Sequence, residues 1–265
     1  MGTSAPLRLG RTREGYDLTL DLSDSWHTAV QGMSRSGKSV ATYALLAPLA
    51  SRRDVVVCGV DPTGILLNPW RDHPGSQWRH LGTGDMVHAA ETLEALTDEM
   101  DRRIAGLLEQ DLDKLDQFNE ACPLLVVVLE EYPGTLSAAE GDDAASGAKA
   151  ADRVQPRIKR CVRRLVQEGA KVGVRLMVIA QRMDASIVGG AERSNLGNRI
   201  TLRVDNSDAV SMLHPMAGPE VVDVVTRMPV GRAIVDRPGE DMAMVQVDFL
   251  DYKGYVRHVR EHAPE

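Results

Sequence analysis

Cysteine and aromatic residues are scarce in this chain of 265 residues, which has three cysteines and 4% aromatic residues. Cys58, Cys122 and Cys161 lie far apart without a CxxC spacing, so we interpret them as reduced residues and not as disulfide partners or metal ligands. No apolar run approaches the ~20 residues that a membrane-spanning helix needs. The start, MGTSAPLRLGRTREG, also lacks the apolar core of a signal peptide. These absences predict a cytoplasmic protein.

An excess of positive charge is also missing, because 31 Lys and Arg residues face 38 Asp and Glu residues, for a net charge of -7. The charge of the whole chain therefore does not indicate a nucleic-acid partner. It does not exclude one, since a ring-shaped motor can confine positive charge to its bore. The seven histidines show no metal-ligand spacing, and the three tryptophans are too scattered to form a base-stacking platform.

No internal repeat is evident, and short β-rich runs alternate with longer helical stretches. This alternation predicts an α/β fold in which a mostly parallel sheet carries helices on both faces. We expect an edge strand over residues 17–22 and further strands over 27–31, 55–60, 124–129, 174–180, 199–204, 231–236 and 243–249. We expect the main helices over 37–50, 85–110 and 153–170.

The length of the chain favours one large domain. Residues 1–26 are expected to supply the edge strand and a lead-in, and residues 27–251 the α/β domain itself. Residues 252–265 are rich in charge, and we expect them to form a frayed tail. The small, polar, Gly-rich stretch 134–152 is either a mobile loop or a weakly ordered helix start.

Residues 32–39 match the pattern GxxxxGK[ST], and they follow a predicted strand and open a predicted helix. In such a loop the backbone N–H groups and the positive end of the helix face phosphate oxygens. The lysine reaches the β- and γ-phosphates, and the hydroxyl of the last residue can ligate Mg²⁺. A chance Gly/Ser turn is the alternative. We therefore predict an ATP and Mg²⁺ site formed by Gly32, Met33, Ser34, Arg35, Ser36, Gly37, Lys38, Ser39 and Val40.

Two carboxylates, Glu130 and Glu131, follow the apolar run 124–129. Carboxylates at the end of a buried strand are costly unless they meet a cation or water. We assign Glu130 to the magnesium ion, together with Ser39, and Glu131 to the base that activates the attacking water. An ordinary solvated pair is the alternative. Aspartate is usual at the first position, so the extra methylene of Glu130 is a departure.

One predicted strand, 55–60, separates the phosphate-loop unit from the acidic strand, which is the arrangement of RecA-like motors. No NKxD-type guanine-reading motif is visible, which favours ATP. The strand 174–180 ends at Gln181, whose side chain is predicted to sense the γ-phosphate. A simple cap of the strand end is the alternative.

Several motifs together resemble the FtsK/SpoIIIE motor family of the HerA–FtsK superfamily. They are GMSRSGKSV, VVVCGVDP, EMDRR followed by FNEA, LVVVLEEY, GVRLMVIAQR and NRITLRVDNSDAVSML. The resemblance covers about residues 7–250. It implies a RecA-like ATPase that forms a hexameric ring, hydrolyses ATP at subunit boundaries and pulls double-stranded DNA through its bore without sequence preference.

Two related branches are also similar to this chain. Proteins resembling EccC drive protein secretion, and actinobacterial plasmid-transfer proteins resembling Tra/TraB move double-stranded DNA between cells. Against the family pattern, this chain has no membrane-spanning N-terminus and no C-terminal winged-helix module, so we expect a bare motor recruited by partners, a membrane-anchored one among them. Glu130 and the stretch 132–134 also depart from the family motif Asp-Glu-Phe-Ala-Asp.

A ring ATPase needs a positive charge supplied across the subunit boundary to the γ-phosphate. Arg199 resembles the family position suited to that role, with Arg182 as second choice. The alternative for Arg199 is an ion pair with Asp205 or Asp208.

Arginines on the helix 153–170 recur at steps of four, three and four, which places them in one basic stripe. We expect part of this stripe to contact DNA phosphates or the neighbouring subunit, with a solvated helix face as the alternative. The candidate residues are Arg153, Arg157, Lys159, Arg160, Arg163 and Arg164.

The sequence thus predicts an ATP-driven double-stranded DNA translocase that acts in plasmid transfer or chromosome segregation. An ATPase that moves protein substrates and a degenerate nucleotide-binding regulatory subunit are the two alternatives. The patterns leave open the ring size, the direction of travel and the cellular process.

Overall fold

The computed structural model describes residues 6–183 and 189–264. Its strands form one sheet in the spatial order β2-β1-β10-β9-β8-β3-β7-β6-β4-β5. The strands are β1 (Leu7–Thr12), β2 (Asp17–Leu20), β3 (Thr28–Gln31), β4 (Val55–Asp61), β5 (Arg79–Leu81), β6 (Leu124–Leu129), β7 (Val174–Ala180), β8 (Asn198–Leu202), β9 (Arg232–Asp236) and β10 (Ala243–Val247).

The sheet has a parallel part and an antiparallel part. From β8 to β5 all neighbouring strands pair in parallel. From β8 through β9, β10 and β1 to β2 all neighbours pair antiparallel. Strands β4, β6 and β7 are buried along their whole length, which explains their uninterrupted apolar sequences. The predicted α/β fold with a mostly parallel sheet is confirmed.

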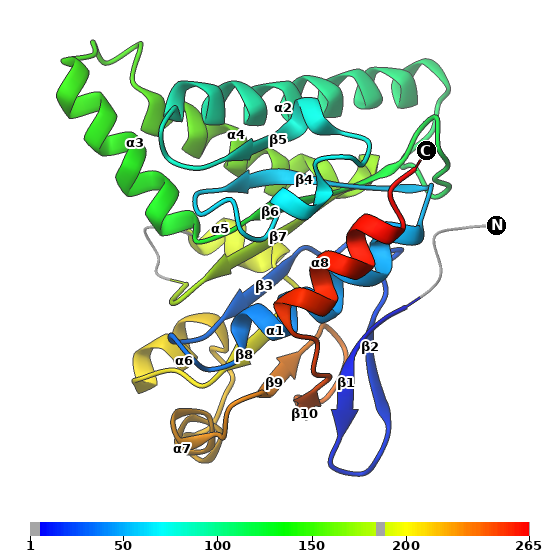
Figure 1. The fold of residues 1–265 in the computed structure, drawn as a ribbon, viewed down its shortest axis with the longest axis vertical. Coiled ribbons are helices and arrows are strands. Elements are labelled where there is room, and N and C mark those ends of the chain that lie inside the picture. The colour runs from blue at the N-terminus through cyan, green and yellow to red at the C-terminus, as the bar shows by residue number, and fades with distance from the viewer. Residues whose placement is uncertain (1–5, 184–188, 265) are drawn as a thin grey trace.

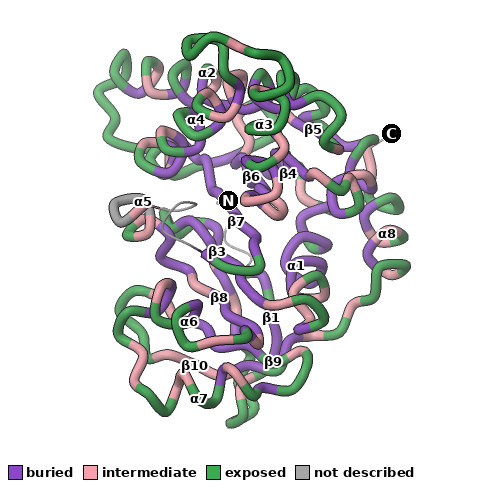
Figure 2. The backbone as a smooth tube through the Cα atoms, turned by 90° about the vertical axis from the view of Figure 1, so that its left-hand side faces the viewer, coloured by how far each residue is buried: buried purple, intermediate pink, exposed green. Residues whose placement is uncertain are grey.

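Helices cover both faces of the sheet, as Figure 1 shows. One face packs against α1 and α8, and the other against α2, α3 and α4, which gives two separate apolar clusters. Figure 2 shows the sheet interior buried between these layers. The α-helices are α1 (Lys38–Leu46), α2 (Met86–Glu109), α3 (Tyr132–Ser146), α4 (Val154–Glu168), α5 (Gly190–Asn195), α6 (Ser207–Leu213), α7 (Pro219–Arg227) and α8 (Tyr252–Glu261).

Short 3₁₀ turns connect several of these elements. They are η1 (Ala47–Ser51), η2 (Asn68–Trp70), η3 (Ser76–Trp78) and η4 (Gly169–Val172). Strand β7 lies between β3 and β6, although it follows both in the sequence. Because these three strands are parallel, their carboxyl ends lie at the same edge, and the segments that follow β3, β6 and β7 meet there.

The expected frayed tail from Tyr252 is wrong, because residues 252–261 form helix α8. Its Tyr255 and Val259 are fully buried. The Tyr255 ring stacks on Tyr43 of α1 with centroids 4.6 Å apart. The charged residues of this segment occupy the outer face of an amphipathic helix, so a high charge content did not mean disorder.

Three further elements differ from the sequence expectations. Strand β1 was not predicted, yet it lies between β10 and β2, so that β2 alone forms that edge of the sheet. Strand β5, of three residues, was also not predicted. The stretch that begins at Tyr132 is helical as far as Ser146, which favours the helix interpretation of residues 134–152 over the loop.

The hydroxyl of Tyr255 fastens α8 to the rest of the molecule. It donates to the Leu66 carbonyl at 2.8 Å and accepts from Trp70 Nε1 at 2.6 Å. Tyr255→Phe would leave both buried groups without a partner, so we expect a loss of about 1–3 kcal/mol in unfolding free energy. Urea denaturation measures the change. Tyr16→Phe, at a side chain that is 73% exposed, is the control and should change stability by less than about 0.5 kcal/mol. Equal midpoints for both variants would contradict the prediction.

Candidate nucleotide-binding site

The predicted phosphate loop connects β3 directly to α1, which begins at Lys38. Neighbouring strand ends hold the loop in place through backbone hydrogen bonds. The Gly32 N–H donates to the Ala180 carbonyl at the end of β7 (3.3 Å), and the Met33 N–H donates to the Arg203 carbonyl just after β8 (2.9 Å). On the far side, the Gly231 N–H donates to the Ser36 carbonyl at 3.0 Å. The loop is therefore fixed by the ends of three strands.

Two glycines of the loop are required by its geometry. Gly37 has φ of 101° in the left-handed region, and a Cβ there would lie 3.0 Å from the Gly231 nitrogen. At Gly32 a Cβ would lie 2.6 Å from Ser36 Oγ. Arg35, at the exposed tip, also has a positive φ of 63°, which is uncommon for a residue with a side chain. The backbone is thus bent tightly, as wrapping around a phosphate demands.

The acidic end of β6 faces this loop. Glu131 adopts a left-handed backbone conformation (φ 40°, ψ 52°) at the N-cap of α3. Its carboxylate accepts a hydrogen bond from Lys38 Nζ at 3.3 Å, with both side chains largely shielded from water. This conformation is strained for a non-glycine residue, and in it the Glu131 carboxylate reaches the lysine of the phosphate loop. The structure therefore brings Lys38 and Glu131 together across 93 residues of sequence.

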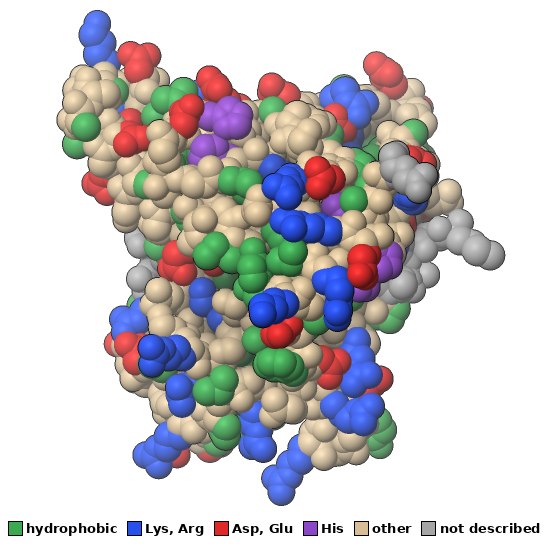
Figure 3. All heavy atoms as spheres, in the orientation of Figure 1, with side chains coloured by type: hydrophobic (Ala, Val, Ile, Leu, Met, Phe, Trp, Pro, Cys, Tyr) green, Lys and Arg blue, Asp and Glu red, His purple; other side chains and the backbone are tan. Residues whose placement is uncertain are grey.

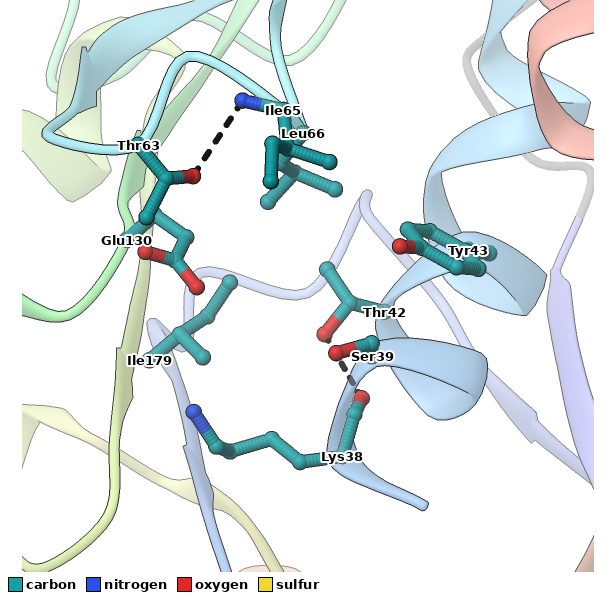
Figure 4. Close-up of a pocket in the computed structure, with 9 residues that line it drawn as sticks. All are labelled: Lys38, Ser39, Thr42, Tyr43, Thr63, Ile65, Leu66, Glu130 and Ile179. Atoms are coloured by element: carbon teal, nitrogen blue, oxygen red, sulfur yellow. Dashed lines mark hydrogen bonds between the residues drawn. The ribbon is translucent and has the colours of Figure 1, made fainter. Parts of the chain in front are cut away.

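Glu130 lines a cavity of about 220 Å³ next to the first turn of α1. Figure 4 shows the Glu130 carboxylate and the Lys38 ammonium group pointing into this cavity from opposite sides. Burial raises the pKa of Glu130 to about 7, and Asp61 and Glu131 add to the rise while Lys38 opposes it. Glu130 Oε2 is buried and has no hydrogen-bond partner among the described residues.

A nucleoside triphosphate with Mg²⁺ fits these residues. Besides Glu130 Oε2, the buried Ser36 Oγ in the loop also has no partner among the described residues. Buried polar atoms without partners are rare and call for a ligand, an ion or water. The N–H groups of Gly32, Met33 and Ser36 donate within the protein, so the N–H groups of residues 34, 35 and 37–40 and the Lys38 ammonium would hold the phosphates. Ser39, which lines the same cavity as Glu130, would hold Mg²⁺ with it.

Asp61, at the end of β4, also shapes the site and was not assigned from the sequence. It is fully buried, and its carboxylate accepts hydrogen bonds from the backbone N–H groups of residues 63, 64, 66 and 67 and from the Thr63 hydroxyl. These bonds fix the segment 61–67, which forms one wall of the cavity. The run Asp-Pro-Thr-Gly after a buried strand is a turn signal that could have indicated this role.

Gln181 directly follows β7, between the phosphate loop and the acidic strand end. Its side chain is exposed, and its role as a γ-phosphate sensor stays a prediction.

Gln31, the last residue of β3, holds the segment that follows β7, and this role was not predicted from the sequence. Gln31 accepts from the Met183 N–H (3.3 Å) and donates to Thr201 Oγ1 (3.0 Å) and to the Ala209 carbonyl (2.9 Å).

This buried network continues away from the phosphate loop. His214 Nε2 lies 2.7 Å from Thr201 Oγ1, and His214 Nδ1 lies 3.3 Å from Asp236 Oδ2. The Asp236 carboxylate can only accept, so His214 Nδ1–H donates to it, and Nε2 of the neutral imidazole then accepts from the Thr201 hydroxyl. The network therefore links β3, β8, β9 and α6 behind the phosphate loop.

Arg199 belongs to the far end of this network. Its guanidinium donates to the Leu196 carbonyl (2.9 Å) and to Asp236 (3.5 Å), and 19% of the side chain is exposed. The alternative partners Asp205 and Asp208 are therefore wrong, because Asp236 is the partner and Asp205 bonds Arg182 at 2.6 Å. Arg199 lies two residues before Thr201, which pairs with the last residue of β3.

Two arginines of the basic stripe on α4 form hydrogen-bonded ion pairs with acidic residues of α2. Arg157 donates to Glu94 through two bonds of 2.8 and 2.9 Å. Arg164 bonds both Asp101 and Glu168. Arg160 lies 3.7 Å from Glu94 with a side chain that is 68% exposed, and Lys159 is exposed. Within the stripe, Lys159 and Arg160 are thus the better placed to meet an external phosphate.

A comparison with protein-family models matches residues 3–218 to the FtsK/SpoIIIE family. The chain belongs to this family. Among curated relatives, it is 25% identical to the DNA translocase SftA of Bacillus subtilis (strain 168) over 227 residues, which cover 80% of this chain and 22% of that protein. It is 28% identical to the DNA translocase FtsK of Helicobacter pylori (strain J99) over 218 residues, 76% of this chain and 24% of that protein. It thus spans about a quarter of the length of these relatives.

Solved structures with the same fold include two proteins with different cellular roles. The pCW3 conjugation coupling protein TcpA, in a monomer form with ATPγS, is similar with a TM-score of 0.75 and 20% identity, over 97% of this chain and 70% of that one. The cytoplasmic domain of the type VII secretion ATPase EccC of Thermomonospora curvata has a TM-score of 0.72 and 19% identity, over 100% of this chain and 32% of that one. At these identities the likeness shows the P-loop fold alone. No helix in the described ranges has the length and apolarity to span a membrane.

The raised pKa of Glu130 predicts a pH dependence of stability in the metal-free protein. The folded-state pKa of about 7 lies above the ordinary value of 4.5, so the folded state keeps this proton at pH values where the unfolded state has lost it. Stability should therefore fall as pH rises from about 4.5 through about 7. Glu130→Gln should remove this loss and be more stable than the wild type at pH 8, by about 1–3 kcal/mol.

Thermal unfolding in EDTA at pH 5.5 and pH 8 measures this difference. Glu109→Gln, at an exposed position of α2, is the matched control and should follow the wild type at both pH values. The prediction is contradicted when Glu130→Gln shows the same change in melting temperature between the two pH values as the wild type.

Proposed function

We propose that this protein is an ATPase that translocates double-stranded DNA, with the nucleotide bound between the phosphate loop and the end of β6. The observation that carries the proposal is the position of Glu131, whose carboxylate lies 3.3 Å from the phosphate-loop lysine in a chain of the FtsK/SpoIIIE family. The curated relatives SftA and FtsK are DNA translocases, which supports DNA as the substrate that is moved.

The residues of the site divide the chemistry among them. Lys38 would bind the β- and γ-phosphate oxygens, and it must then give up its bond to Glu131. The freed Glu131 carboxylate can accept a proton from the attacking water, as a general base does. Gln181 would contact the γ-phosphate from the end of β7. When bound, Mg²⁺ would offset negative charge that develops on the phosphates. Ser39 and Glu130 would hold it, and Glu130 must lose its proton to do so.

A ring completes the proposal. We infer that several copies, six in the family arrangement, surround the DNA and that an arginine from the neighbouring copy approaches the γ-phosphate. Arg199 is kept as the candidate, although its bond to Asp236 would have to break or turn for that role. The process served is plasmid transfer or chromosome segregation inside the cell, and a membrane-anchored partner would localise the ring.

Hydrolysis should depend on Lys38 and Glu131 in different ways. Lys38→Ala should abolish nucleotide binding, because the phosphates lose their cation. Glu131→Gln should retain nucleotide binding and lower the hydrolysis rate by about 10²–10⁴-fold, the range that a positioned general base contributes. Phosphate release and the fluorescence of a labelled ATP measure the two effects, with Glu109→Gln as the control for a glutamate outside the site. A chain that binds ATP but turns none over, with or without Glu131, would be a nucleotide-binding regulatory subunit.

The substrate is tested by the ATPase rate with and without long double-stranded DNA at low and moderate salt. Stimulation of the rate by DNA that weakens as salt rises supports a DNA translocase, since phosphate contacts release counterions. A rate that is indifferent to DNA at both salt concentrations would reject it and favour an ATPase that moves protein substrates.

A further inference from the structure

Charge is distributed unevenly over this acidic molecule. Residues 86–146, from α2 through α3, contain 15 acidic and 3 basic residues, a net charge of -12. Because the whole chain has a net charge of -7, the remaining residues carry a net charge of +5. Figure 3 shows acidic side chains at the end of the molecule formed by α2 and α3, and mostly basic side chains toward the opposite end, where β1, β9 and β10 lie.

A groove of about 420 Å³ opens at that basic end, on β1, β9 and β10. Three arginines line it, Arg11 and Arg13 from the β1 end of the hairpin and Arg232 from β9. Gln246 of β10 pairs with Arg232 on one side and with Arg11 on the other. These three residues are direct cross-strand neighbours, so their side chains form one row on the same face of the sheet.

Two of these arginines have no acidic partner within residues 6–183 and 189–264. Arg11 is paired with Asp17 at 3.3 Å. Arg13 and Arg232 are exposed, and neither makes an ion pair with any residue of the described ranges. They differ in this from Arg157 and Arg164 of α4, whose charges are matched by acids of the same chain. Arg13 and Arg232 are therefore cations whose counterion is expected to come from outside the chain.

We propose that Arg13 and Arg232 bind backbone phosphates of double-stranded DNA in this groove, an inference that rests on the proposed function. The lining has no aromatic residue on which a free nucleotide base could stack, and its polar groups are donors suited to phosphate oxygens. An exposed row of donors on a sheet face recognises the charge of the backbone and not its sequence, as a translocase requires.

The groove is joined to the phosphate loop through one residue, Gly231. Its N–H donates to the Ser36 carbonyl of the loop (3.0 Å), while its own carbonyl accepts from Gln246 Nε2 in the groove (3.1 Å). Arg232 is the next residue of the chain. A force on Arg232 or Gln246 is therefore transmitted to the phosphate loop through a single residue, which would connect DNA contact with nucleotide hydrolysis.

Charge reversal tests the assignment. The variant Arg13→Glu with Arg232→Glu is compared with Arg257→Glu plus Arg260→Glu, which makes the same change in net charge at two exposed positions of α8. DNA binding is followed by fluorescence anisotropy of a labelled duplex at several salt concentrations, together with the ATPase rate with and without DNA. We expect the groove variant to bind DNA more than tenfold more weakly, to lose about two units from the slope of log K against log salt, and to keep its rate without DNA. The α8 variant should resemble the wild type in all three.

The single variant Arg13→Glu, on a different element from Gly231, should show about half of the loss in slope. An equal loss of affinity in the groove and α8 variants would show an effect of net charge alone and overturn the assignment, as would a groove variant that binds like the wild type. A lower affinity for labelled ATP in the groove variant would overturn it in favour of a nucleotide site. Wild-type protein that neither binds duplex DNA nor responds to it would reject the proposed function, and this inference with it.

Discussion

The placement of three charges at one edge of the sheet is the constraint on which the rest of the structure depends. Lys38, Glu130 and Glu131 lie at the ends of buried elements, where a charge without a partner is costly. Lys38 and Glu131 form an ion pair, whereas burial raises the pKa of Glu130 to about 7. These charges are therefore not balanced by one another, and the phosphates and divalent cation that we propose to bind here would bring charges that match all three.

The neighbouring elements hold the residues of this site in place. Gln31 fixes the entry to the phosphate loop, and Asp61 fixes the segment that closes the cavity, each through several buried hydrogen bonds. Buried networks that are fully satisfied specify a single geometry, because any displacement leaves a polar atom without a partner. The phosphate loop is thereby formed in advance and does not need to be ordered by the nucleotide, which lowers the entropic cost of binding.

The sequence was most informative at positions where the residue type has a single structural explanation. The central strands were predictable because runs such as 124–129 are apolar on both faces, and the phosphate loop because its pattern needs glycine at fixed positions. The sheet edge and the C-terminal helix were less predictable, since β1 and α8 owe their stability to partners more than 180 residues away. The ion pairs of α4 were missed for the same reason, because spacing along a helix places its arginines on one face but cannot show that α2 presents Glu94 and Asp101 to them.

Glu131 combines the carboxylate that we propose as the general base with an unfavourable backbone conformation. Glycine or asparagine would adopt φ of 40° at less cost, so position 131 is a place where the fold could gain stability at once. Screens that select variants of this protein only for heat resistance will be drawn to that substitution, and they will discard the group that faces Lys38. A thermostable variant changed at residue 131 would therefore indicate that stability of the fold and the proposed catalysis favour different residues at this position.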